Sequence, residues 1–396
     1  MKSNIYSLYI IKIAKWFNLV MPTIVLFYQN LGMGMQEIFL LKSIYSVVIV
    51  VFEIPSGYCA DAWGRKKTLV AGSVLGTLGF VIYSTNTLFA GFVAAELILG
   101  LGHSLISGAD TAMLYDTLKS EHKATAYLKH EGRITAGGNF AEALAGITGG
   151  LLATISLRTP FMAQVAVAAS AIPAALLLKE PALNTLRDRQ LSFRTLITSA
   201  HNAITRHPTL PWVLLLSSFT GTATLTYAWL VQPYFKAAGL PLALYGVMWT
   251  LLNLNVGAVG LFAYRLERRL GQQTCMIGVV VVIAGSYFLT GRYISLQAVA
   301  VLFVFYTARG MATPVLKEYI NRDCASAVRA TILSLRNFII RINFAAAGPV
   351  LGWVVDHHSL NSAYWLAGGA YLTAGAACLG FFTFRKHTIR PHPEKT

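Results

Sequence analysis

About twelve apolar segments of roughly 20 residues follow one another along this chain, and they constrain its fold more than any other feature. A helix of that length crosses the hydrocarbon core of a bilayer. The runs are continuous rather than alternating, which argues against a β-barrel. The segments lie near residues 5–30, 37–60, 68–86, 88–117, 132–155, 160–178, 211–235, 241–264, 273–290, 296–320, 328–355 and 361–384. We therefore expect an all-α membrane protein with twelve transmembrane helices.

The composition agrees with a lipid environment. Only 12% of the residues are charged and 55% are hydrophobic, whereas a soluble domain carries about 25% charged residues. The net charge of +16 is explained by Lys and Arg in cytoplasmic loops rather than by nucleic-acid binding. No Cys/His spacing is typical of a metal site and no nucleotide-binding motif is present. These observations favour a transporter over an enzyme, with the bilayer as a partner and no nucleic acid, metal or cofactor.

The placement of Lys and Arg predicts the topology. With both termini in the cytoplasm, 23 of the 32 basic residues fall on the cytoplasmic side. Three lie in outer loops (Arg158, Lys236 and Arg292), and the other six lie in or near spans. An asymmetry of this size indicates a multi-pass protein with cytoplasmic termini.

One longer loop divides the segments into six and six. We predict an N-terminal bundle over residues 1–178, a cytoplasmic linker with an amphipathic helix over 179–210, and a C-terminal bundle over 211–396. A shift of 202 residues brings Gly108 onto Gly310 and Asp116 onto Glu318. The two bundles are therefore expected to be pseudo-symmetric, with a substrate site between them near the midplane of the membrane.

A local motif follows the second segment. It reads Gly57-Tyr-Cys-Ala-Asp61-Ala-Trp-Gly64-Arg65-Lys66-Lys67. This resembles the signature G-x-x-x-D-x-x-G-R-[RK] of the major facilitator superfamily, and the twelve-span frame extends the resemblance over the whole chain. A glycine at position 57 allows close helix approach, and one at position 64 permits a tight turn.

The resemblance implies a role in gating for this motif. In the family, an acid at the end of span four often joins the loop Asp and Arg in a charge relay. By resemblance, Asp116 would take that role with Asp61 and Arg65, and Lys66 belongs to the same motif. The N-terminal end of span eleven is a further candidate partner for Asp61. Together these groups would hold the cytoplasmic side closed while the transporter faces outward.

Charged residues at membrane depth are expensive and usually face a cavity or each other. Four acids of the N-terminal half are candidates for proton coupling: Glu53, Glu96, Asp110 and Glu142. Glu96 stands where the family often has Arg. Arg309, Arg336 and Arg341 of the C-terminal half are candidates for binding an anionic substrate group. Either set could instead form structural ion pairs with the other. Trp249, Asn253 and Tyr306 are further candidate substrate contacts.

The resemblance to bacterial efflux members implies secondary active transport by alternating access. The leading expectation is a proton-coupled antiporter that exports a drug or metabolite, working as a monomer in a bacterial inner membrane. Two alternatives remain: uptake of a siderophore or organic anion, drawn to the arginines, and lipid flipping. Neither the substrate nor the transport direction can be read from these residues.

Overall fold

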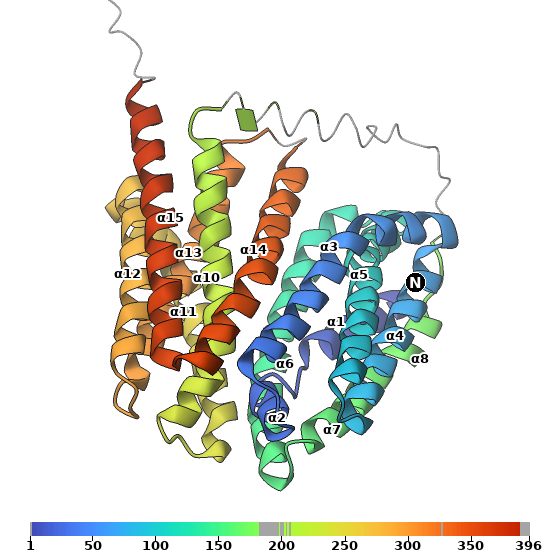
Figure 1. Cartoon of the computed structure of the whole chain (residues 1–396). Coiled ribbons are helices and arrows are strands. Elements are labelled where there is room, and N and C mark those ends of the chain that lie inside the picture. Colours follow the sequence, from blue (N-terminus) through green and yellow to red (C-terminus); the bar gives the residue numbers. More distant parts are fainter. Residues whose placement is uncertain are drawn as a thin grey trace, which may run out of the picture. The chain divides into compact units, whose positions relative to one another are not determined.

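Helices make up the architecture of the described chain (Figure 1). The computed structural model describes residues 2–181, 198, 202, 204–205, 207–325 and 328–388, and no strand occurs among them. The first part of the chain contains α1 (Lys2–Trp16), α2 (Ile24–Asn30), α3 (Met35–Trp63), α4 (Arg65–Thr85), α5 (Phe89–Ser120), the 3-10 helix η1 (Ala124–Ala126), α6 (Tyr127–Ile155), α7 (Thr159–Ala169) and α8 (Ala171–Leu176). The second part contains α10 (Leu210–Ala237), the 3-10 helix η2 (Leu242–Leu244), α11 (Tyr245–Leu270), α12 (Gln272–Arg292), α13 (Val299–Arg322), α14 (Arg329–His357) and α15 (Leu360–Thr388).

Ten helices of the described chain are long and apolar enough to cross a membrane. They correspond to ten of the twelve predicted segments, with α7 and α8 together forming one span. The predicted segment 5–30 is divided into α1 and α2 by residues 17–23, which are not helical. The predicted segment 132–155 lies in α6, a helix of 29 residues. Its first turns carry Lys129, Glu131 and Arg133, and Glu142 follows, so its apolar character is weaker.

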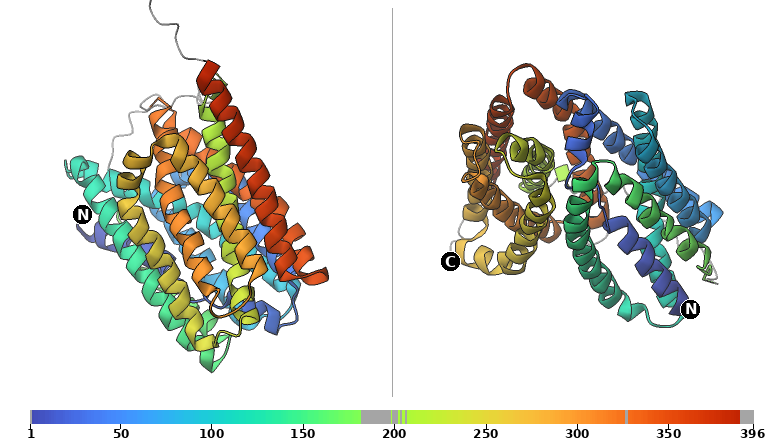
Figure 2. Two further views of the ribbon diagram at one scale, coloured as in Figure 1. Left: turned by 90° about the vertical axis from the view of Figure 1, so that its left-hand side faces the viewer. Right: turned by 90° about the horizontal axis from the view of Figure 1, so that it is seen from below.

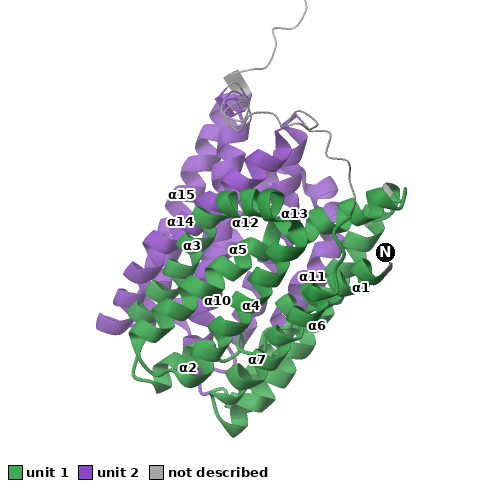
Figure 3. Cartoon of the chain, turned by 90° about the vertical axis from the view of Figure 1, so that its right-hand side faces the viewer, with its two compact units in different colours: residues 1–186, 240–251 green, residues 187–239, 252–396 purple. Residues whose placement is uncertain are grey.

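Packing divides the chain into two compact units (Figure 3). The first comprises residues 1–186 and 240–251, and the second comprises residues 187–239 and 252–396. Residues 240–251, placed in the C-terminal bundle from the sequence, thus pack with the first unit. Most of the predicted linker helix in 179–210 lies outside the described residues. Within each unit the long helices run side by side (Figure 2).

Glycines bring helices close together in the first unit. α4 packs along α5, and a Cβ atom on Gly102 would lie 3.0 Å from the carbonyl oxygen of Gly72. α6 packs equally closely on the start of α11. A Cβ atom on Gly246 would lie 2.2 Å from the carbonyl oxygen of Gly146 and 2.9 Å from Cα of Gly150. Thr250 on α11 also donates a hydrogen bond of 2.9 Å to the carbonyl of Ala143. Small residues at such contacts are the usual means of helix association in lipid.

We expect Gly246→Ala to weaken this contact. The added methyl group would overlap the backbone of α6, and overpacking of this kind costs about 1–3 kcal/mol. Gly257→Ala on the same helix is the matched control, because a Cβ atom there meets no atom within 4 Å. Thermal unfolding in detergent should show a lower midpoint for Gly246→Ala and no loss for Gly257→Ala. Equal midpoints for the two variants would contradict the close approach.

Tyrosines form the core of the second unit. Tyr227 stacks on Phe305 with ring centroids 3.5 Å apart and lies at right angles to Tyr287. Tyr227 also hydrogen-bonds Thr290 at 2.7 Å, and the Tyr364 hydroxyl donates to the carbonyl of Leu230 at 2.9 Å. These four aromatic rings are fully buried. Because the hydroxyl groups of the three tyrosines are all hydrogen-bonded, the cluster holds α10, α12, α13 and α15 together.

Candidate functional site

The predicted gating motif forms the turn between α3 and α4. Gly64 has φ of 93°, a conformation that favours glycine and lets the chain reverse between the two helices. A Cβ atom on Gly57 would meet no atom within 4 Å. No described residue of the first unit therefore approaches α3 closely at Gly57, whereas the tight turn expected at Gly64 is present.

Arg65 forms an ion pair with Asp116 at the end of α5. Its guanidinium also donates a hydrogen bond of 2.8 Å to the carbonyl of Ala112. Both side chains of the pair are largely buried, with 23% and 14% exposed. Asp61 is exposed and forms no ion pair with any residue that the structure describes. Two of the three residues of the expected relay are thus brought together, because Arg65 reaches Asp116 and Ala112 on α5, and the part of Asp61 in the relay stays a prediction.

Glu180 completes this site, and sequence reasoning missed it. Its carboxylate accepts hydrogen bonds from the backbone N–H groups of Arg65 at 2.8 Å and Lys66 at 3.0 Å. Gly64 has no side chain to cap α4, so Glu180 satisfies donors at the positive end of that helix. The available signal was the position of Glu180 directly after span six, on the same predicted side of the membrane as the motif.

A double-mutant cycle measures the Arg65–Asp116 pair. We expect Arg65→Gln and Asp116→Asn to interact by about 1–3 kcal/mol in stability, as residues in direct contact do. Unfolding of the wild type, both single variants and the double variant gives this value. The comparison cycle pairs Arg65→Gln with Asp61→Asn. A larger interaction in that second cycle would favour the expected relay over the observed pair.

Two acids share one lysine in the first unit. Lys12 on α1 lies 3.0 Å from Glu131 on α6 and 3.9 Å from Asp110 on α5. We call these three residues the Lys12 cluster. The side chains of Lys12 and Asp110 are each 7% exposed and that of Glu131 is 31% exposed. Glu131 was not predicted as a site residue because it lies at the polar start of its helix.

The charged groups around the Lys12 cluster come from the same three helices. Lys15 lies close enough to act on Asp110, and Tyr127 is influenced by both acids. Tyr9 hydrogen-bonds Nδ1 of His130 at 3.2 Å and lies within electrostatic reach of Arg133. Asp110 is therefore almost fully buried, accepts a hydrogen bond from the Thr111 backbone N–H, and has Lys12 at the limit of ion-pair distance.

Glu96 occupies a closed polar centre of the first unit. It accepts hydrogen bonds from Lys42 and from the hydroxyl of Tyr83, and the Tyr28 hydroxyl lies 3.3 Å away. Glu96 is 2% and Lys42 is 7% exposed. The aromatic rings of Phe27, Phe92 and Phe161 surround the tyrosines of this centre. Glu96 is thus enclosed by hydrogen-bonding partners from α2, α3 and α4, and its role in proton coupling stays a prediction.

The two remaining predicted acids, Glu53 and Glu142, lie on α3 and α6. Glu53 on α3 is exposed and has no ion pair with a described residue. Glu142 on α6 is half-buried. Neither of them belongs to the Lys12 cluster.

The three predicted arginines line one cavity of about 370 Å³ in the second unit. Arg309 comes from α13, and Arg336 and Arg341 come from α14. The other lining residues are Thr220, Gly221, Thr224, Leu225, Ala228, Ala312, Thr313, Leu316, Asn337 and Ile340. We call this space the arginine cavity. No acidic side chain occurs among the residues that line it.

The other predicted substrate contacts occupy different positions. Tyr306 is fully buried in the aromatic core, and the Arg309 guanidinium lies 5.4 Å from its ring centroid. Trp249 is 5% exposed and packs near Gly146 of α6 in the first unit. Asn253 is half-buried on α11.

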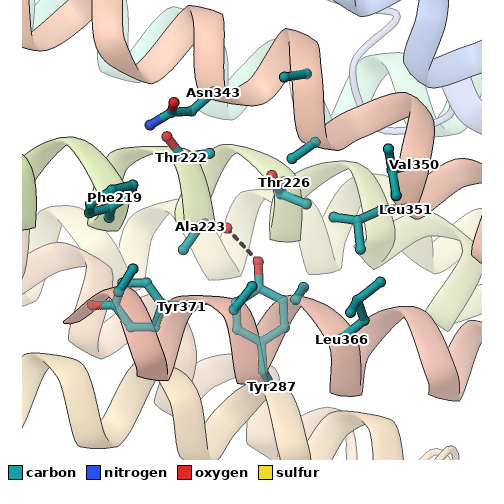
Figure 4. Close-up of a pocket in the computed structure, with 15 residues that line it drawn as sticks. Phe219, Thr222, Ala223, Thr226, Tyr287, Asn343, Val350, Leu351, Leu366 and Tyr371 are labelled. Atoms are coloured by element: carbon teal, nitrogen blue, oxygen red, sulfur yellow. Dashed lines mark hydrogen bonds between the residues drawn. The ribbon is translucent and has the colours of Figure 1, made fainter. Parts of the chain in front are cut away.

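A second cavity of the same unit is apolar and has a volume of about 510 Å³ (Figure 4). It is lined by Phe219, Thr222, Ala223, Thr226, Tyr287, Asn343, Ala346, Ala347, Val350, Leu351, Leu366, Ala367, Ala370, Tyr371 and Ala374. Thr222 from α10 and Asn343 from α14 lie at one end. The Tyr287 hydroxyl donates to the carbonyl of Ala223 at 2.6 Å. We call this space the apolar cavity. In the described chain no group of three His, Cys, Asp or Glu side chains is placed to hold a metal ion.

Comparison with known proteins gives a family and a fold. The model of the Major Facilitator Superfamily matches residues 13–347. An uncharacterized transporter of Buchnera aphidicola subsp. Schizaphis graminum is 35% identical over 81 residues, which are 20% of each chain. The quinolone resistance protein NorA of Staphylococcus aureus is 24% identical over 163 residues, which are 41% of each chain. The chain thus matches well under two thirds of the length of these curated relatives.

Two solved structures cover nearly the whole chain. A mutant of the nucleoside transporter NupG has a TM-score of 0.81 at 13% identity, covering 96% of this chain and 99% of that one. The D-xylose-proton symporter has a TM-score of 0.71 at 15% identity, covering 96% and 97%. At such identities the likeness shows the fold alone. It confirms the predicted fold class of two six-helix bundles.

Proposed function

The chain belongs to the major facilitator superfamily of membrane transporters, and on that premise we propose that it exports a small organic compound in exchange for protons. The transporter would expose its substrate site to one side of the membrane at a time, which is alternating access. It would lie in a bacterial inner membrane with both termini in the cytoplasm. The protein would work as a monomer. It would need no cofactor, because the proton gradient would supply the energy for transport.

The Lys12 cluster is the observation that carries the proton part of this proposal. Burial disfavours the charged form of a carboxylate, and a nearby cation favours it. Asp110 is buried and its cation is shared with Glu131, so a small movement of Lys12 changes the balance at Asp110. A group of this kind can take up a proton in one conformation and release it in another.

The Arg65–Asp116 pair supports the alternating-access part of the proposal. Breaking a largely buried ion pair is costly unless its charges are paired again or rehydrated. The pair and the Glu180 cap would therefore favour one arrangement of the cytoplasmic ends of α3, α4 and α5. Substrate or proton binding would have to supply the energy that shifts this arrangement.

Similarity to the quinolone resistance protein supports export as the direction. Uptake is the alternative, and lipid flipping is a second candidate function. The apolar cavity favours lipid flipping, because an acyl chain requires a lining of this kind. The arginine cavity argues for a polar solute instead.

Sealed vesicles that contain the purified protein and an internal pH-sensitive dye test the proposal. After a proton gradient is imposed, cationic drugs, siderophores and organic anions are added in turn. Proton movement opposite to an added compound is the expected result. Movement in the same direction would establish uptake, and a folded protein silent toward the whole panel would contradict proton-coupled transport of these classes.

A further inference from the structure

We propose that the arginine cavity binds an anionic group, a carboxylate or a phosphate, of the transported compound. This inference rests on the proposed transport function and adds the chemical class of the substrate. Its basis is three guanidinium groups around one cavity of about 370 Å³ whose lining contains no acid. Cavities of a few hundred Å³ suit small organic molecules.

Arg336 is the most deeply buried of the three, with 6% of its surface exposed. Its guanidinium donates to the hydroxyl and carbonyl oxygens of Ser217 and, at 3.3 Å, to the side chain of Asn337. All of these acceptors are neutral. They hold the side chain in place, and they leave its positive charge without a counter-ion among the described residues of the second unit.

Arg309 and Arg341 are half-buried at the same cavity. Arg309 has the ring of Tyr306 beside it as an attractive but neutral contact. Arg341 forms no ion pair with a described residue of its unit. Lys317 of α13 lies close enough to Arg336 for their charges to repel. The field in the cavity is therefore strongly positive.

Uncompensated charges at membrane depth are costly, and an anionic ligand removes that cost. Arginine suits the task because its planar fork donates two parallel hydrogen bonds to a carboxylate or phosphate. Thr220, Thr224 and Thr313 add hydroxyl groups to the lining, and Ala312 and Leu316 add apolar surface. The cavity therefore fits a compound with an anionic head and a small, partly apolar body.

Binding to the purified wild-type protein in detergent tests this without a gradient. The probes are phthalate, citrate and phenyl phosphate, with phthalamide as the neutral counterpart of phthalate. A ligand that binds only the folded protein raises its melting temperature, and the rise grows with the logarithm of the ligand concentration once that concentration exceeds Kd. We expect an anion-dependent rise that phthalamide does not produce. Dioleoyl phosphatidylglycerol is tested separately to distinguish a lipid headgroup from a free solute.

Arg309→Gln and Arg341→Gln should each weaken anion binding by about tenfold or more, because each removes charge-assisted hydrogen bonds. Arg→Lys at the same positions should recover part of the affinity. Arg292→Gln, an exposed arginine outside the cavity, is the matched control and should bind as the wild type does.

Three outcomes would overturn the inference: equal shifts with phthalate and phthalamide, unchanged binding in Arg309→Gln and Arg341→Gln, or a response to phosphatidylglycerol alone. A marked loss of stability in both variants without any anion binding would mean that the arginines neutralise acids elsewhere in the chain.

The anion site and proton coupling can be disproved independently of each other. Anion binding without proton movement in vesicles would remove proton coupling only, and proton-coupled transport of neutral or cationic compounds by both variants would remove the anion site only.

Discussion

Glu96→Gln is expected to destabilise the protein by about 3–5 kcal/mol, because it leaves the Lys42 charge buried without its counter-ion. The two side chains are 2% and 7% exposed, and the Lys42 ammonium lies 5.2 Å and 5.5 Å from the ring centroids of Tyr28 and Tyr83 and donates to the Tyr83 hydroxyl at 3.3 Å. Glutamine would preserve the size of the side chain and would remove only the charge. Thermal or denaturant unfolding in detergent measures the loss.

A double variant distinguishes the lost pair from a general packing defect. Lys42→Met combined with Glu96→Gln removes both charges, and such replacements are often neutral or stabilising. Most of the lost stability should therefore return. Glu121→Gln at the end of α5 is the control, where a carboxylate that is 18% exposed accepts a hydrogen bond of 3.1 Å from the exposed Lys123. It should lower the midpoint far less than Glu96→Gln does, because an ion pair near the surface contributes little to stability. A double variant as unstable as Glu96→Gln would contradict the pairing.

The spans were predictable from the sequence because segment length and hydropathy decide what crosses a bilayer. The break at residues 17–23 and the packing of residues 240–251 with the first unit were not. Both depend on contacts between distant helices, such as that of Gly246 with Gly146 and Gly150. Periodicity within a single segment contains no information about such contacts.

The candidate site was predicted in its residue types more than in its pairings. The motif and the acid at the end of span four indicated Arg65 and Asp116, which the structure brings together. The rule that charges at membrane depth pair with each other applied to Glu96, but its partner was missed. Lys42 lies 54 residues away, and only the packing of α3 on α5 brings the two together. Glu180 and Glu131 were missed because they lie at polar helix ends, where an acid is unremarkable.

Asp110→Asn is expected to uncouple transport from the proton gradient. Lys12 keeps Glu131 at 3.0 Å in this variant, so the helices stay linked while the buried titratable group is lost. When the binding of one ligand is coupled to that of another, it typically changes the other's affinity by about 5–150-fold. The change that protonation makes in substrate affinity should therefore disappear in this variant. Gradient-driven accumulation in vesicles would then fall toward the level reached without a gradient, while exchange of substrate without a gradient would continue.

Glu131→Gln separates the two acids of the cluster. Removing the Glu131 charge leaves Lys12 to Asp110 alone, and a closer cation stabilises the charged carboxylate. Asp110 keeps its titratable carboxyl in this variant, so coupling to the proton gradient should persist with a changed pH dependence. Glu53→Gln is the comparison for an exposed acid without an ion pair to a described residue. Only a group whose charge changes during the cycle can couple the proton gradient to substrate movement. Full coupling in Asp110→Asn together with loss of coupling in Glu53→Gln would therefore assign the proton site to α3 instead of α5.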